Sequence, residues 1–151
     1  MNVSDVVNKI MDAWSSDEAI ADYCLSAFSR RPMFQDAIDE NQPPGEDDFP
    51  MICIYDWHSE GGLTTPMIRY QFFVGIAVRD KGITMDDIRR VKSYDGLHRA
   101  EFLRGLVERS LLSARIGKVV WEGGGEVINS FPTFASISVV TVEVHNKRTR
   151  E

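Results

Sequence analysis

The fold of this chain is decided by an alternating stretch in its middle, Ile68-Arg69-Tyr70-Gln71-Phe72-Phe73-Val74-Gly75-Ile76-Ala77-Val78. Every second residue from Ile68 to Val78 is large and apolar. Successive side chains of a β-strand point to opposite faces, so this period predicts a strand with one face toward a core. Residues 51–55 form a second, shorter apolar run, and Pro50 before it suits the start of a strand. We expect the two runs to pair as a long hairpin.

Helical spacing dominates the residues that precede these strands. The first apolar set follows one helix face: Val3, Val6, Val7, Ile10, Met11 and Trp14. Ser15 and Glu18 have the spacing of a capping box, which predicts a break and a second helix start. Pro32 limits how far this second helix can extend. We expect two short helices, or one kinked helix, in this part of the chain.

A further helical region is predicted over about residues 86–115, with an interruption near Gly96. Its later part carries apolar residues at helical spacing: Ala100, Leu103, Leu106, Val107, Leu111 and Ala114. Asp86 and Asp87 would then lie in the first turn, where the helix dipole favours negative charge.

The C-terminal part of the chain is again typical of strands. Residues 118–121 lead into the triple glycine 123–125, a predicted turn, and residues 135–144 are rich in Ile, Val, Thr and Ser. The element order contains no repeated βαβ unit. It predicts one α+β domain over residues 1–151, with a mostly antiparallel sheet of four to five strands flanked by helices mainly on one face.

The composition is that of an ordinary globular protein, with 43% hydrophobic and 26% charged residues. No apolar run approaches the roughly 20 residues that span a bilayer, and residues 1–5 lack the basic start and apolar block of a secretory signal. We therefore expect the protein to stay in the compartment where it is made, with no membrane partner. Cys24 and Cys53 fall among apolar residues, which predicts buried free thiols.

Charge is divided unevenly along the chain. Residues 1–75 hold 13 acids and 4 bases, a net charge of −9, whereas residues 76–151 hold 10 acids and 13 bases, a net charge of +3. The acids include Asp47 and Asp48 in a proline-containing stretch, about 35–48, which we predict to be a mobile loop. A basic tail, about 146–151, closes the chain.

This division of charge has two interpretations. It allows the acidic part of one copy to face the basic part of another, or both parts are simply solvated surface. An acidic protein is a poor candidate for coating nucleic acid, and we expect no sequence-specific binding of DNA or RNA.

Motifs for catalysis are not found in the sequence. There is no phosphate-binding glycine loop, no G-x-S-x-G and no CxxC, and we expect no catalytic residue and no cofactor. One alternative is a small metal-dependent enzyme using Asp56, His58 and Glu60, whose two-residue spacing would put them on one face of a strand. Another is a ligand-binding adaptor domain with a pocket formed by Tyr55, Trp57 and Trp121.

A family resemblance is carried by the order of several features along nearly the whole chain. They are the helical Asp17-Glu18-Ala19-Ile20, the acidic loop that runs into Phe49-Pro50-Met51-Ile52-Cys53-Ile54-Tyr55, the alternating strand to Val78, the helix that ends in Leu111-Leu112-Ser113, and the block from Glu126 through Pro132 to Val144. In this order and pattern the chain resembles the tail terminator and tail completion proteins of tailed bacteriophages and prophages.

The resemblance implies a structural protein with an α+β fold and no enzymatic activity. Such proteins assemble as hexameric rings that cap the tail tube, end its polymerisation and offer a surface to the head. The implied partners are other copies of the chain, the tail-tube protein and a head-completion or connector protein. The implied location is the host bacterial cytoplasm during assembly and the virion tail afterwards.

No functional residue can be carried over from the family, so contact residues are predicted from loops and charge clusters alone. They are Asp47, Asp48, Trp57, His58, Glu60, Arg89, Arg90, Lys147 and Arg148.

Overall fold

The computed structural model describes residues 2–122 and 127–146, and its centre is the predicted alternating strand, β3 (Met67–Arg79). This strand belongs to a six-stranded sheet in the order β1–β2–β3–β8–β6, with β7 also paired to β8. The other strands of the sheet are β1 (Met33–Gln35), β2 (Met51–Glu60), β6 (Lys118–Glu122), β7 (Val127–Ser130) and β8 (Thr133–His145). Among the described strands of this sheet, β1 and β2 pair in parallel and the other pairs are antiparallel.

Pairing of β3 on both sides fixes which side chains face the core. Its partner β8 runs antiparallel in unbroken register from Met67 opposite His145 to Arg79 opposite Thr133. On its other side β3 pairs with β2, and the predicted hairpin between these two strands is confirmed. The predicted alternation is confirmed too, because the core side chains of β3 are all buried: Tyr70, Phe72, Val74, Ile76 and Val78.

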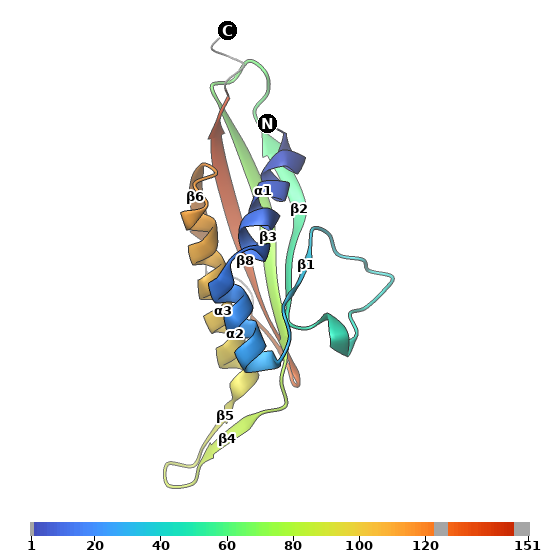
Figure 1. Ribbon diagram of the computed structural model, residues 1–151, viewed down its shortest axis with the longest axis vertical. Coiled ribbons are helices and arrows are strands. Elements are labelled where there is room, and N and C mark those ends of the chain that lie inside the picture. The colour runs from blue at the N-terminus through green and yellow to red at the C-terminus, as the bar shows by residue number, and fades with distance from the viewer. Residues whose placement is uncertain (1, 123–126, 147–151) are drawn as a thin grey trace.

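Three helices cover this buried face of the sheet: α1 (Val3–Ser15), α2 (Glu18–Phe28) and α3 (Asp95–Ser113) (Figure 1). The side chain of Trp14 on α1 is fully buried, and its Nε1 donates a hydrogen bond of 3.2 Å to the carbonyl oxygen of Val107 on α3. The predicted class is therefore confirmed as α+β with a mostly antiparallel sheet and helices on one face.

Details of the predicted elements need correction. The main sheet has six strands rather than four to five, because the short strands β1 and β7 carry no alternation long enough to detect. The break after α1 is where the sequence predicts it, but the residue that caps the N-terminus of α2 is Asp17 rather than Ser15. The Asp17 carboxylate accepts hydrogen bonds from the backbone amides of Ala19 and Ile20, at 2.9 and 3.3 Å.

The predicted start of the third helix is wrong. Residues 83–94 form a hairpin of two strands, β4 (Ile83–Asp86) and β5 (Val91–Tyr94), and the helix begins only at Asp95. The Asp86 carboxylate accepts bonds from the amides of Ile88 and Arg89, which closes a turn instead of capping a helix. Arg90 completes this turn with a positive φ of 57°.

Gly96 does not interrupt a helix either, because it lies in the first turn of α3 against the ring of Phe134. The acidic stretch leads from β1 through residues without regular structure to the 3-10 turn η1 (Glu46–Asp48). The predicted glycine turn at 123–125 and most of the basic tail fall outside the described residues.

Two glycines of α3 provide a test of the packing between the helix and the sheet. A Cβ on Gly96 would lie 2.5 Å from the Phe134 ring and 2.8 Å from Asp80 Cβ, whereas a Cβ on Gly105 meets nothing within 4 Å. We expect Gly96→Ala to lower the free energy of unfolding by about 1–3 kcal/mol through overpacking. Gly105→Ala is the matched control and should raise it by roughly 0.5–1 kcal/mol.

Chemical denaturation at 25 °C measures both variants. Equal effects of the two substitutions, in either direction, would contradict the close approach of α3 to β8.

Candidate interaction surfaces

The face of the sheet opposite the helices has no described helix packed on it, and its middle is apolar. We call it the open face. Its apolar side chains come from five strands: Met51, Cys53, Tyr55, Phe73, Ala77, Val120, Ile128, Ala135, Ile137 and Val139. An antiparallel sheet can leave one face to water, but such a face usually carries polar side chains. Phe73, Val120 and Ile128 are instead exposed.

An aromatic pair forms the centre of the open face. Tyr55 and Phe73 are directly opposite each other on β2 and β3, with stacked rings whose centroids are 5.5 Å apart. The Tyr55 ring also extends over Gly75, because a Cβ there would lie 3.4 Å from Tyr55 Cε1 and 3.0 Å from Cys53 Sγ. The pair therefore forms an apolar platform, and the neighbouring Cys53 is only 4% exposed.

Charged residues gather at one end of the open face. Arg69 lies between two carboxylates, with Nη2 2.9 Å from Glu143 and Nη1 3.9 Å from Glu60. His58 Nε2 lies 3.5 Å from the other oxygen of Glu60. A hollow of about 270 Å³ lies among these groups and Glu122. All of them are partly exposed, so water screens their interactions.

The residues of the metal hypothesis are divided by a β-bulge. Between Tyr55 and His58 the pairing of β2 with β3 shifts, and Asp56 has a positive φ of 53°. His58 and Glu60 lie together on the open face, whereas Asp56 lines a different hollow beside Trp57. Within the described parts of the chain, no three potential metal ligands are grouped closely enough to hold an ion.

The aromatic residues of the adaptor hypothesis do not share a pocket. Tyr55 and Trp57 line the same hollow at the edge of β2. Trp121 lies opposite Val140 on the helix-covered side of the sheet and packs against the core.

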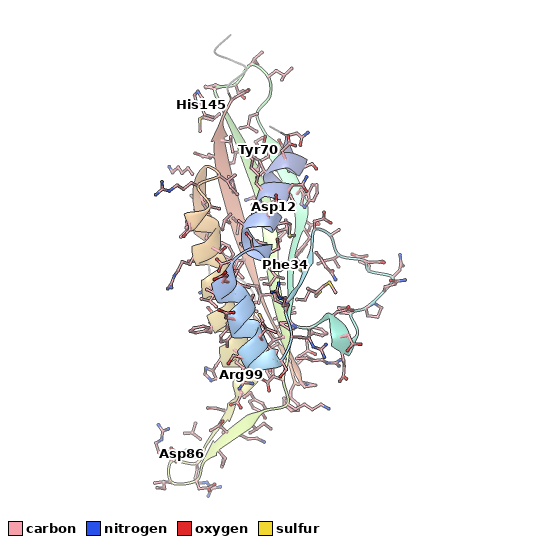
Figure 2. All side chains as sticks on the ribbon, viewed as in Figure 1. Asp12, Phe34, Tyr70, Asp86, Arg99 and His145 are labelled. Atoms are coloured by element: carbon pink, nitrogen blue, oxygen red, sulfur yellow. The ribbon has the colours of Figure 1, made fainter. Side chains whose placement is uncertain are left out.

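The hairpin of β4 and β5 extends away from the body of the molecule, with Asp86 near its far end (Figure 2). Its base is fixed by polar contacts: Asp80 accepts from the Gly82 amide at 2.7 Å, and Thr84 Oγ1 donates to Asp95 at 2.8 Å. Its apolar side chains are nonetheless exposed, namely Ile83, Met85, Val91 and, at 96% exposure, Ile88. A two-stranded hairpin without a core of its own is only marginally stable in water, which points to a partner.

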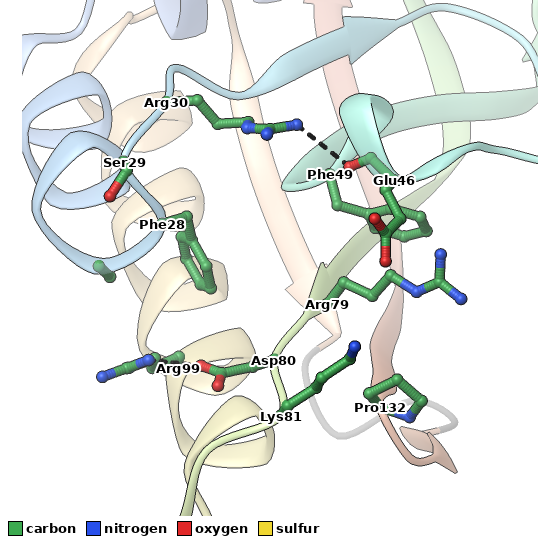
Figure 3. Close-up of a pocket in the computed structure, with 11 residues that line it drawn as sticks. Phe28, Ser29, Arg30, Glu46, Phe49, Arg79, Asp80, Lys81, Arg99 and Pro132 are labelled. Atoms are coloured by element: carbon green, nitrogen blue, oxygen red, sulfur yellow. Dashed lines mark hydrogen bonds and ion pairs between the residues drawn. The ribbon is translucent and has the colours of Figure 1, made fainter.

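A basic pocket of about 390 Å³ opens near the base of this hairpin (Figure 3). Its walls include the apolar Phe28, Phe49 and Pro132, the basic Arg30, Arg79, Lys81 and Arg99, and the acidic Glu46 and Asp80. Arg99 forms an ion pair with Asp80, and the Arg79 guanidinium lies 5.7 Å from the centre of the Phe49 ring. The pocket has the chemistry to accept an acidic group attached to an apolar body.

Other predicted contact residues are divided between η1, the hairpin and the tail. Asp47 lies 3.4 Å from Arg30, and Asp48 accepts a bond from the Gly45 amide at 2.9 Å. Arg89 is paired with Asp86 at 2.7 Å, which lowers the pKa of that carboxyl. Lys147 and Arg148 lie outside the described residues.

Two features were not predicted from the sequence. They are the hairpin of β4 and β5, which we call the hairpin arm, and the basic pocket. The arm had only a weak signal, since residues 83–86 alternate in polarity but residues 91–94 do not. The pocket had none, because its walls come from segments far apart in the sequence.

None of the helices in the described residues is long and apolar enough to cross a lipid bilayer. No family model matches this chain, and no curated protein matches it.

Both cysteines are free and buried, as predicted, and their reactivity can be tested. Burial raises the pKa of Cys24 to about 12; it also raises the pKa of Cys53, an effect that backbone hydrogen bonding with Gly75 partly offsets. Thiolate is the reactive form, so neither thiol should react with Ellman's reagent at pH 8 in the folded protein. The control is the protein unfolded in guanidinium, where both should react. A thiol in the folded protein that reacts as fast as free cysteine would contradict the burial.

Proposed function

We propose that this protein is a structural assembly protein that works by binding other proteins. Its copies form a ring on the end of a bacteriophage or prophage tail tube, stop the tube from growing and present a surface to a head-completion or connector protein. This places the protein in the host bacterial cytoplasm during assembly and in the virion tail afterwards. Two observations support the proposal. The order of the elements resembles that of tail terminators, and the surfaces described above are suited to contact with other proteins.

The observation that carries this proposal is the open face. It presents the Tyr55–Phe73 platform, flanked by Val120 and Ile128, with no described helix covering it. Contiguous exposed apolar surface on a folded domain marks a site of protein contact. A sheet face of this kind suits contact with another protein better than a small ligand, which requires a concave site.

The polar end of the same face supports this interpretation. Arg69, Glu60, Glu143 and His58 form an exposed network at its border. An apolar centre with a charged rim is the usual anatomy of a protein interface, where the rim contributes to specificity more than to affinity.

Light scattering on the purified protein, alone and with the tail-tube protein, tests the proposal. We expect a ring, either in solution or only on tube ends, and tubes of limited length. Phe73→Asp should weaken this assembly at least tenfold, because burying a phenylalanine contributes about 1.5–3 kcal/mol.

The matched control is Leu112→Asp, a similar change at an exposed apolar position on α3. It should leave assembly unchanged. A strict monomer at every concentration, with the tube protein present, would disprove the proposal.

A further inference from the structure

The tip of the hairpin arm combines an apolar side chain with positive charge. Ile88 is 96% exposed, the highest value among the exposed large apolar residues. Arg89 is paired with Asp86, and Lys92 lies over the ring of Tyr94 at 5.6 Å. Arg90 has no ion-pair partner among the described residues. Asp87 adds a carboxylate at the same tip, so residues 86–92 hold three bases and two acids, a net charge of +1 beside the exposed isoleucine.

A surface of the opposite character lies beside the bulge of β2. We call it the acidic hollow. It has a volume of about 530 Å³ and is lined by Asp36, Ala37, Ile38, Glu40, Tyr55, Asp56 and Trp57. Ile38 is 50% and Trp57 39% exposed, so apolar surface is available in it. No described basic residue forms an ion pair with its three carboxylates.

Both surfaces expose apolar side chains, and their net charges are opposite. The arm has an exposed isoleucine and a net charge of +1 over residues 86–92, and the acidic hollow has exposed Ile38 and Trp57 with three carboxylates. A buried isoleucine contributes hydrophobic free energy, while the opposite charges speed association and fix the orientation. Each feature contains a residue with positive φ, Arg90 in the turn of the arm and Asp56 in the bulge of β2.

The positions of the two surfaces make the contact intermolecular. The arm extends from one end of the molecule below α3, while the segment after β1 lies along its side next to β2 (Figure 1). The arm is held at its base by Asp80 and Asp95 and points away from the acidic hollow of its own chain. Two different surfaces that join copies of one chain form a heterologous contact, which closes into a ring or continues as a filament.

We propose that the hairpin arm of one copy docks into the acidic hollow of a second copy, with Ile88 against Ile38 and Trp57 and Arg90 beside Asp36 or Glu40. This inference rests on the proposed function, because it names the contact between neighbouring subunits of the ring. It accounts for an exposed hairpin, an exposed tryptophan and an uneven charge distribution with one interaction.

Disulfide trapping tests the contact in the full chain. The variant Ile38→Cys with Ile88→Cys should give a ladder of covalent dimers and larger species when oxidised, since each copy offers both halves of the contact. Either single variant should stay monomeric on a non-reducing gel. A mixture of the two single variants should stop at dimers. The control is Ile38→Cys with Leu112→Cys, which should give no ladder.

A charge exchange is the second arm of the same experiment. Arg90→Glu and Glu40→Arg should each weaken association at least tenfold, and the two together should restore much of it. Arg109→Glu, at an exposed position on α3, is the control and should have no effect.

The outcomes separate this inference from the proposed function. A ring that still forms with Arg90→Glu, and no ladder above the control, would overturn the docking of the arm while leaving the ring in place. A strict monomer with the tube protein present would overturn both.

Discussion

The structure depends on the double pairing of β3. This strand is hydrogen-bonded along its length to β2 on one side and β8 on the other, so none of its side chains can change face without breaking two registers. The face that carries Phe72 and Val74 receives all three helices and builds the core around Trp14. The opposite face is then determined as well, and with it the platform of Tyr55 and Phe73.

The bulge in β2 changes which side chains of this strand face each surface of the sheet. By inserting a residue between Tyr55 and His58, it keeps both side chains on the open face. It also places Asp56 and Trp57 at the edge of the acidic hollow. The apolar platform and the acidic hollow are therefore adjacent and share Tyr55.

The long elements were predictable because each repeats a period many times. The alternation from Ile68 to Val78 and the helical spacing from Val3 to Trp14 leave little ambiguity. The hairpin arm was misread because its strands have only four residues each, and because Asp86 and Asp87 imitate the first turn of a helix. A carboxylate that accepts bonds from the amides two and three residues further on is the same local signal in both structures: Asp17 does so at the start of α2, and Asp86 does so in the turn of the hairpin. The pairing of β4 with β5 decides between them.

The candidate surfaces were less predictable than the fold. Trp57 and His58 were expected among the contact residues, but the sequence could not show that the bulge directs Asp56 away from His58 and so divides the metal triad. The acidic hollow requires the segment 36–40 to lie against β2, a contact that depends on the short parallel pairing of β1. Pairings of three residues carry no periodic signal, so such juxtapositions become visible only in three dimensions.

Electron cryo-microscopy of the protein assembled with the tail-tube protein is the most direct test of the heterologous contact between copies of this chain. A ring built by arm docking predicts identical subunits around one axis, each with its β4–β5 hairpin against residues 36–40 and 56–57 of the next copy. Single copies, or pairs related by a twofold axis with both arms in solvent, would contradict it.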